Sequence, residues 1–335
     1  MKTAVVLLNW NGLEYLKKFL PHTLSCSKKA EVYVIDNGST DGSLAYLHSL
    51  EQVHTIMLEK NYGFAEGYNK GLQYIDAELY CFLNTDVKVT SDWVAPFQNY
   101  FKKNPSVAIA QPHILNYNHP DLFEYAGAAG GYLDAFGYAF CRGRLFDSME
   151  KDMGQYDTEE DLHWASGACF FIRKSVFNSL EGFDRHFFAH QEEIDLCWRA
   201  RHLGYHIRSL ATVKVWHIGG GTLAPSPYKT YLNFRNSLAM LTKNDPSKYY
   251  PVKLLFRLIL DGLAAGRFLF LGRWRTVLAI LKAHLDFYAQ FFIYQKQRKE
   301  IQPRASNLSQ SIVYLYYIKK IKKFKDLPLN SSIKL

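Results

Sequence analysis

The sequence predicts an α/β fold with an open, mostly parallel sheet, helices on both of its faces, and a C-terminal helical appendage. Three observations support this prediction. The expected strands are short, continuous apolar runs, as in parallel strands that are buried on both faces. Segments with apolar residues at helical spacing separate these runs. After about residue 226 the pattern becomes helical throughout.

The predicted strands and helices alternate along the first part of the chain. They are, in order, a strand at 3–8, a helix at 13–25, a strand at 31–35, a helix near 41–50, a strand at 53–58, a helix after Gly63 and a strand at 79–83. Most of the apolar runs stop abruptly at a polar turn. Because ligands of a doubly wound sheet bind outside the carboxyl ends of its strands, we expect these turns to meet in one crevice.

The middle of the chain is less regular. Residues 114–160 are rich in Gly, Tyr and Asp and lack clear periodicity, so we expect long loops there. Regular patterns return at 164–180 and at 191–204. A strand at 213–216 then leads to His217 and three glycines.

Charge is distributed unevenly along the chain, whose net charge is +9. Residues 226–335 hold 20 Lys and Arg against 5 Asp and Glu, a net charge of +15, which leaves −6 for residues 1–225. This asymmetry indicates a catalytic domain at 1–225 joined to a segment for an anionic surface, either membrane phospholipid or nucleic acid. We expect an amphipathic helical region at 226–300 and a basic tail of little order at 301–335.

Cysteine usage and the N-terminus indicate a cytoplasmic protein. The five cysteines are scattered and include no CxxC pair, so we expect neither a disulfide framework nor a zinc site. The first apolar run is too short for a signal peptide. No uncharged apolar run reaches about 18 residues, so we expect no membrane-spanning segment.

Two polar clusters follow early strands. Residues 36–43 (DNGSTDGS) can hydrogen-bond a base and a ribose, or can simply cap the next helix. Residues 61–71 (NYGFAEGYNKG) carry glycine at every fourth position from Gly63. One helix face is thereby left bare, either for close approach of a ligand or for tight packing of the helix on the sheet.

Asp86 follows the strand at 79–83 in the sequence Asn84-Thr85-Asp86. A carboxylate at a strand end suits Mg²⁺ or Mn²⁺, since these ions need only one or two protein carboxylates when phosphate oxygens complete the coordination shell. The alternative is that Asp86 merely begins a turn.

Glu192, Glu193 and Asp195 precede an apolar helical pattern. Acidic residues are favourable at a helix N-terminus, and Asp195 is spaced to form a structural ion pair with Arg199. Crowded carboxylates raise one another's pKa, so one of the two glutamates is suited to accept a proton. His217, at a strand end, is either a ligand or a structural histidine.

Taken together, the motifs of residues 1–225 resemble those of family-2 inverting glycosyltransferases, which have a GT-A, Rossmann-like fold. The similarity is greatest to rhamnosyltransferase-like members of bacterial surface-polysaccharide assembly. The motifs that carry the resemblance are NWNG, DNGSTDGS, NYGFAEGYNKG, NTD, WASGACFFIRK, FFAHQEEIDLCWR and WHIGGG. The resemblance implies transfer of a sugar from a nucleotide-diphosphate sugar, either dTDP-rhamnose-like or a UDP-sugar, to a hydroxyl of a glycan or lipid-linked glycan.

The resemblance also implies a donor site. Asn9 and Asp36 match positions that line the base and ribose pocket, with Gly63 and Asn69 beside them. Asn84 stands where the family's DXD-type motif has its first acid. The metal therefore keeps fewer charged ligands, and we expect it to bind together with the donor.

The catalytic roles are implied in the same way. Asp86 matches the last acid of the DXD-type motif, and His217 matches a histidine that helps to hold the metal or the diphosphate. Glu193 matches the second acid of an "ED" pair, the general base, with Glu192 as its neighbour. Here that second acid is Glu rather than Asp, which lengthens the base by one methylene group.

The rear third carries two apolar stretches interrupted by cations, at 252–271 and 273–292, and a lysine cluster at 319–325. Basic amphipathic helices with aromatic edges lie in a membrane interface, and the lysines add attraction to anionic lipid. We therefore expect peripheral attachment to the cytosolic face of a membrane. The alternative is that these helices pack on the catalytic domain or on a second subunit in a homodimer. Nucleic acid is not expected as a partner, because no recognised binding module accompanies the charge.

Two other functions remain as alternatives from the sequence. The chain could be an inactive nucleotide-sugar-binding scaffold. Against this, all the acidic residues of the motifs are present except at position 84, where Asn84 replaces an acid. It could also be a sugar-1-phosphate nucleotidyltransferase, which has a broadly similar fold. Such an enzyme is expected to carry a Gly- and Arg-rich loop near its N-terminus, and residues 9–18 (NWNGLEYLKK) lack one.

Overall fold

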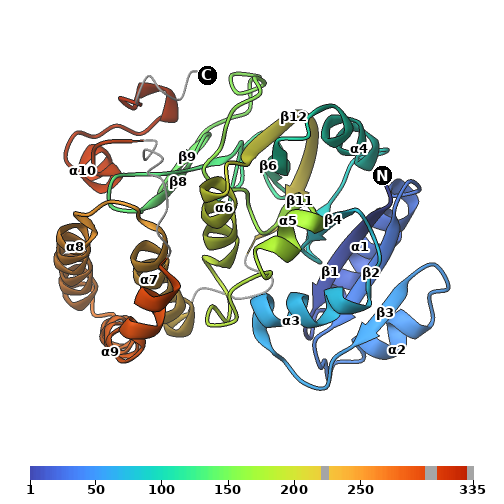
Figure 1. The fold of residues 1–335 in the computed structure, drawn as a ribbon, viewed down its shortest axis with the longest axis horizontal. Helices are drawn as coiled ribbons and strands as arrows, with labels where there is room; N and C mark the ends of the chain where they lie inside the picture. The colour runs from blue at the N-terminus through green and yellow to red at the C-terminus, as the bar shows by residue number, and fades with distance from the viewer. Residues whose placement is uncertain (220–225, 299–307, 330–335) are drawn as a thin grey trace.

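The computed structural model describes residues 1–219, 226–298 and 308–329 (Figure 1). Its main sheet has eight strands in the order β3-β2-β1-β4-β11-β6-β12-β5. Their bounds are β1 (Thr3–Asn9), β2 (Glu31–Asp36), β3 (His54–Met57), β4 (Leu79–Leu83), β5 (Val87–Lys88), β6 (Val107–Asn116), β11 (Cys169–Arg173) and β12 (His206–His217). Strands β11 and β5 run antiparallel to their neighbours, and the other pairings are parallel. The predicted mostly parallel sheet is confirmed.

Helices cover both faces of this sheet, as predicted. Alternate residues of β1 enter two different cores, with Ala4 and Val6 in one and Val5 and Leu7 in the other. The helices that pack into the second core are α1 (Leu13–Cys26), α2 (Ser43–His48) and α4 (Val94–Lys103). Those that pack into the first are α3 (Gly63–Gly71), α5 (Lys174–Ser179) and α6 (Glu192–His202). A continuous apolar strand is therefore stabilised from both sides, since each fully buried aliphatic side chain contributes about 1.5–3 kcal/mol.

The strand order reverses beside β1. The chain moves outward from β1 to β2 and β3 on one side, and then returns to place β4 on the other side. In an open α/β sheet such a switch point opens a crevice outside the carboxyl ends of the strands. Asn9 ends β1, and Asn84 directly follows β4, so both lie at this crevice.

The expectation of long loops at 114–160 is wrong in part. Strand β6 extends to Asn116, and a small antiparallel sheet follows with β7 (Gly131–Leu133), β8 (Ala139–Cys141), β9 (Arg144–Leu145) and β10 (Ser148–Met149). These strands are two or three residues long, too short to show a period of two. Strand β6 escaped prediction because Gln111, Pro112 and His113 interrupt its apolar run.

The C-terminal helical region is present as α7 (Pro227–Asn244), α8 (Tyr250–Phe270), α9 (Trp274–Gln297) and α10 (Ile312–Tyr317). Figure 1 shows α7 next to α6, with α8 and α9 at the edge of the molecule. Leu238 and Leu241 of α7 are fully buried in the same core as the main sheet. The boundary predicted at 225 therefore does not separate α7 from the core of the sheet, and the α8–α9 hairpin is the part that projects.

The tail is more ordered than expected. Ile312, Tyr316 and Phe324 are buried in the main core, and the Ile312 N–H donates to Asp134 at 2.8 Å. The prediction of little order is thus wrong for residues 308–329. Their apolar side chains are buried in the core, and the lysines that lie among them in the sequence are exposed. Residues 301–307 and 330–335 of the predicted tail, and residues 299–300 before it, lie outside the described residues.

One helix qualifies the expectation that no segment spans a membrane. Helix α9 is long and apolar enough to do so by length and composition, with a mean hydropathy of 1.2. One of its faces packs against the protein, however, through Ala283, Phe287 and Tyr294, which are buried. The other face bears large exposed apolar side chains.

Candidate active site

The ends of β1 and β2 carry a bonded polar pair. The Asn9 Nδ2 donates to Asp36 Oδ2 at 3.0 Å and to Ser39 Oγ at 3.1 Å, and the Ser39 N–H donates to Asp36 Oδ1 at 2.9 Å. Asn9 and Asp36 are both buried. The Asn9 Oδ1 is also buried and accepts no hydrogen bond within the described residues. A ligand donor is one means of satisfying such an atom.

The glycine face of α3 packs on the sheet. A Cβ at Gly71 would lie 2.3 Å from the Ile35 side chain, and one at Gly67 would lie 3.0 Å from Leu8. Gly63 has a φ of +78°, and a Cβ there would meet the Phe188 carbonyl oxygen at 2.5 Å. Of the two interpretations of this face, helix packing is therefore the one that the structure supports. Gly63 contacts the segment before α6 rather than an open space.

The side chain of Asn69 is likewise bonded to the protein itself. Its Nδ2 donates to the Phe183 carbonyl at 2.8 Å, and its Oδ1 accepts from the Phe183 N–H at 3.0 Å. Both ends of the amide are thus bonded to one backbone residue. The structure assigns Asn69 to joining α3 to the segment that precedes α6.

Asp86 and His217 lie together, although they are far apart in the sequence. The Asp86 Oδ1 is 3.1 Å from His217 Nε2, and Asn84 Nδ2 is 3.5 Å from the same nitrogen. Asp86 and His217 are buried. Pairing of β5 with β12 places Val87 opposite His217 and so brings the two side chains together. The glycines at 220 and 221 that follow His217 lie outside the described residues.

Glu124 is a member of this cluster that the sequence analysis missed. Its Oε1 is 3.5 Å from His217 Nδ1, on the side of the ring opposite Asp86. Glu124 is buried and also accepts a hydrogen bond from the Ala126 N–H. Burial alone would lower the pKa of His217, but the two carboxylates outweigh it and raise that pKa to about 10. Glu124 stands in an irregular segment, so its sequence context gave no signal.

The two neighbouring glutamates have different surroundings. Glu192 is buried, and its charge adds to burial in raising the pKa of Tyr68, a buried residue of α3. Glu193 is half-buried, and a Cβ on Gly167 would lie 3.8 Å from its carboxyl carbon and 3.6 Å from the Phe64 ring. Glu193 therefore faces the loop at 165–168, and Glu192 faces the interior.

Burial shifts both acids toward the neutral form. It raises the pKa of Glu193 to about 7, against the opposing effect of backbone N–H groups that include Gly167. Burial and then the charge of Glu193 raise the pKa of Glu192 well above its usual value. A general base works best when its pKa lies near the operating pH. Glu193, the more accessible acid, meets that condition.

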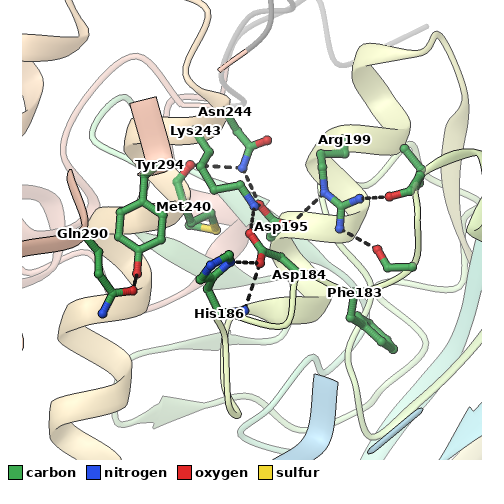
Figure 2. Close-up of polar contacts among 12 residues, drawn as sticks. Phe183, Asp184, His186, Asp195, Arg199, Met240, Lys243, Asn244, Gln290 and Tyr294 are labelled. Carbon is green, nitrogen blue, oxygen red and sulfur yellow. Dashed lines mark hydrogen bonds and ion pairs between the residues drawn. The ribbon is translucent and has the colours of Figure 1, made fainter. Parts of the chain in front are cut away.

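Asp195 points away from this site into a buried ion network (Figure 2). Its Oδ2 lies 2.8 Å from Arg199 Nε, which confirms the predicted structural pair, and its Oδ1 lies 2.9 Å from Lys243 Nζ. Lys243 also contacts Asp184 at 2.5 Å. The network joins α7 to α6, and so supports the helix that begins with the two glutamates.

The predicted residues form one connected region, with two exceptions. Asn9 and Asp36 end neighbouring strands, and the Asn84 N–H donates to the Ala168 carbonyl at 2.9 Å, beside Gly167 and hence beside Glu193. The two exceptions are Gly63 and Asn69, which contact the segment before α6 and have structural roles. The other predicted residues, apart from the inward-facing Glu192, lie at or beside the carboxyl ends of the strands, as expected of a doubly wound sheet.

The residues near the carboxyl ends of β4 and β12 could hold a divalent cation. Asp86 provides a carboxylate oxygen donor, and the His217 imidazole provides a nitrogen donor once metal binding has displaced its proton, with Asn84 adjacent. No group of three or more His, Cys, Asp and Glu within the described ranges is arranged to hold an ion alone. Such a donor set suits Mg²⁺ or Mn²⁺ only if phosphate oxygens complete the coordination shell.

Comparison with known sequences gives a consistent result. The profile of the family described as "Glycosyl transferase family 2" matches residues 4–180. A low-salt glycan biosynthesis hexosyltransferase of Haloferax volcanii is 26% identical over 239 residues, covering 70% of this chain and 73% of the relative. A dTDP-rhamnosyl transferase of Shigella flexneri is 24% identical, covering 64% and 71%. An N-acetylglucosaminyl-diphospho-decaprenol L-rhamnosyltransferase of Mycobacterium tuberculosis is 23% identical, covering 64% and 75%.

Solved structures share the fold at low sequence identity. GalNAc-T7, solved with UDP, GalNAc and Mn²⁺, aligns with a TM-score of 0.57 at 17% identity and covers 72% of this chain and 47% of its own. A mannosyltransferase of Pyrobaculum calidifontis, solved with GDP-Man and Mn²⁺, aligns with a TM-score of 0.50 at 13% identity and covers 89% and 84%. TarS of S. aureus, residues 1–349 with UDP-GlcNAc, also has a TM-score of 0.50, at 14% identity, and covers 77% and 72%.

Proposed function

The chain belongs to glycosyl transferase family 2, and on this premise we propose that it transfers a sugar from a nucleotide-diphosphate sugar to a glycan hydroxyl with inversion of configuration. It is a glycosyltransferase with the GT-A fold. The observation that carries the proposal is the placement of Glu193. Burial raises its pKa to about 7, and it faces the loop at 165–168, whose Ala168 carbonyl is bonded by Asn84, the neighbour of His217.

The donor nucleotide binds at the ends of β1 and β2. Asp36 and the unsatisfied Asn9 Oδ1 offer acceptors for the base and ribose. The name of the Shigella relative supports a dTDP-rhamnose-like donor, and those of GalNAc-T7 and TarS support a UDP-sugar donor, whereas the Pyrobaculum enzyme is named with GDP-Man. The carboxylate of Asp36 is already held by Asn9 and Ser39, so its orientation is fixed before a ligand arrives.

The diphosphate binds at Asp86 and His217 together with Mg²⁺ or Mn²⁺, and Asn84 lies beside them. A bound divalent cation offsets the negative charge that grows on the leaving diphosphate. Asp86 and His217, both buried, would hold the cation at a defined place beside the diphosphate. Glu124 holds the opposite nitrogen of the His217 ring and thereby orients the imidazole, as carboxylates do for metal-binding histidines.

Glu193 acts as the general base. Its carboxylate removes the proton of the acceptor hydroxyl while that oxygen attacks the anomeric carbon from the face opposite the diphosphate. A single displacement of this kind inverts the anomeric centre and requires no covalent sugar–enzyme intermediate. Glu192 is buried, and burial and the charge of Glu193 raise its own pKa, so it is not the acid that contacts the acceptor.

The acceptor is a glycan or a lipid-linked glycan, and the enzyme works at the cytosolic face of a membrane as a peripheral protein. The α8–α9 hairpin supports this location. Phe270, at 92% exposed, and Trp274, at 56% exposed, lie at the hairpin tip between the cations Arg267, Arg273 and Arg275. Apolar and aromatic side chains among arginines are typical of segments that enter a lipid headgroup region.

The lysine cluster at 319–325 adds positive charge near the hairpin. All five lysines of residues 319–325 are exposed, and Arg267 of the hairpin lies 5.8 Å from the ring centroid of Tyr317, just before the cluster. Cations near an anionic leaflet each contribute about 1 kcal/mol. The five cysteines are all unpaired with one another, as is usual in a reducing compartment.

The proposed reaction is tested by incubating the protein with dTDP-rhamnose, UDP-sugars and GDP-sugars, Mn²⁺ and polyprenyl-diphosphate-linked GlcNAc or a free glycan acceptor. We expect transfer from one donor class, with an inverted anomeric centre in the NMR spectrum of the product. Donor binding without transfer to any acceptor would favour a nucleotide-sugar-binding scaffold. Release of pyrophosphate from a sugar 1-phosphate and a nucleoside triphosphate would favour a nucleotidyltransferase.

A further inference from the structure

The turn that leads into α6 has an unfavourable backbone conformation. His190 and Gln191 are consecutive non-glycine residues with φ angles of +70° and +74°. Left-handed backbone is unfavourable at such residues and persists only where surrounding contacts enforce it. Glu192 and Glu193 follow immediately, so the strained turn sets the direction in which the acid pair leaves the chain.

Asn236 of α7 supplies contacts that enforce this turn. Its Nδ2 donates to the Ala189 carbonyl at 2.9 Å and to the His190 carbonyl at 2.8 Å. Asn236 is buried. One amide group is therefore bonded to the peptide units on both sides of His190. These are the peptide units that would rotate if the turn relaxed to a more favourable conformation.

Arg235 fixes the orientation of that amide. Its Nε donates to Asn236 Oδ1 at 2.8 Å, and its Nη2 donates to the His186 carbonyl at 2.9 Å. An amide turned the other way would set its oxygen against two carbonyl oxygens and its NH₂ against a guanidinium. Arg235 is held in turn by the Tyr231 hydroxyl at 3.1 Å, and that hydroxyl donates to Asp286 of α9 at 2.7 Å.

We propose that Asn236, oriented by Arg235, is a positioning residue for the general base, because it holds the strained turn from which Glu193 projects. This inference rests on the proposed function, in which Glu193 takes the acceptor proton. It also makes α7 a part of the active site rather than of an appendage. A misplacement of a base by about 1 Å is enough to slow a reaction by about 10²-fold.

The experiment compares Asn236→Asp with Asn233→Asp. The first change keeps the shape of the side chain but removes both N–H donors. The control removes an amide from the same helix, where Asn233 Nδ2 bonds the Lys229 carbonyl one turn earlier, at 2.9 Å, and no other group of the described residues. We expect Asn236→Asp to lower kcat by about 10–10²-fold with an unchanged donor KM, since the donor contacts lie on other elements. The control should keep the kcat of the wild type.

Hydrogen exchange provides a readout that does not depend on activity. We expect Asn236→Asp to raise amide exchange at residues 186–195 and to leave β1, β2 and β4 unchanged. Asn236→Ser retains one donor and introduces no charge, so it should give an intermediate kcat and intermediate exchange, even if the Asp variant fails to fold. Restoration of part of kcat by Ser over Asp would support positioning.

Two outcomes would overturn the inference. One is a wild-type kcat in Asn236→Asp or Asn236→Ser. The other is unchanged exchange at residues 186–195 in both variants. If the wild type transfers sugar from no donor, the proposed function fails instead, and the exchange comparison still decides whether Asn236 holds the turn.

Discussion

Lys243 Nζ, in α7, lies 2.9 Å from Asp195 Oδ1, in the first turns of α6. Both side chains are buried, and the same ammonium contacts Asp184. Burial alone would raise the pKa of Asp195, but the charges of Lys243 and Arg199 outweigh it and hold that pKa below its usual value. A helix from the basic rear third is thus bonded, in the interior, to the helix that carries the proposed base.

Replacing Lys243 by Met should destabilise the fold strongly. The change leaves Asp184 and Asp195 with less compensation in the interior, which is expected to cost about 3–5 kcal/mol. Thermal unfolding at pH 7 should show a midpoint lower by roughly 10 °C. Lys248→Met, at an exposed position of the same segment, is the control and should unfold like the wild type.

The destabilisation should also depend on pH. The pKa values of Asp184 and Asp195 are lowered in the folded protein, so their contribution to stability is present above the unfolded value, about 4, and is lost as the pH falls through the folded values. The difference between wild type and Lys243→Met should therefore shrink below about pH 4. A constant difference across this range would argue against a charge effect.

Glu193→Gln should lower kcat by about 10²-fold or more, because the amide cannot accept the acceptor proton. Donor binding should change little, since Asn9, Asp36 and Asp86 are untouched. Glu192→Gln is the matched variant and should have the smaller effect, because Glu192 faces the interior. If Glu192→Gln were the severe variant and Glu193→Gln the mild one, the roles of the two acids would have to be exchanged.

The dependence of kcat/KM on pH should report the raised pKa of Glu193. Only the deprotonated carboxylate accepts a proton, so activity should rise with pH through about 7. Glu193→Gln should lose this rising limb along with most of its activity. A limb near the ordinary pKa of a glutamate, about 4.3, would show that the carboxyl group of the base is not shielded from water as the structure indicates.

Asp86→Asn should abolish transfer while leaving the fold intact, because the remaining ligands of the cation are neutral or shared with the diphosphate. Calorimetric titration with UDP, with and without Mn²⁺, should show metal-enhanced binding in the wild type that the variant lacks. Asp92→Asn, at an exposed ion pair with Lys29, is the control. Wild-type turnover that resists EDTA would remove the metal assignment.

The hairpin tip should attach the protein to anionic vesicles. We expect sedimentation with vesicles that contain phosphatidylglycerol, release by raised salt, and little binding to neutral vesicles, since screening shortens the reach of surface charge. A double variant, Phe270→Ser with Trp274→Ser, should bind less, and Tyr74→Ser, at an exposed tyrosine elsewhere, should not. Equal and negligible binding to both vesicle types would show that another protein surface covers the hairpin, and self-association of the wild type would identify it as a second copy.

The sequence by itself determined the sheet and the region of chemistry. Short continuous apolar runs such as residues 3–8, alternating with helical segments, are typical of parallel strands covered on both faces, and the polar residues that end such strands meet at one edge. For that reason the Asn9–Asp36 pair and the Asp86–His217 pair were predictable at the strand ends, as was the location of the acidic pair at a helix start.

Only the tertiary structure decided which polar side chains complete the site. Glu124 beside His217, Asn236 at the strained turn and Lys243 at Asp195 come from segments with no local signal for those contacts. It also decided that the glycines of α3 pack on the sheet, and that apolar residues among the tail lysines are buried. Strand and helix patterns report which face of an element is buried, because burial recurs with the period of that element. A buried polar partner satisfies one atom at one place, leaves no periodic trace in the sequence, and is fixed only when distant segments pack together.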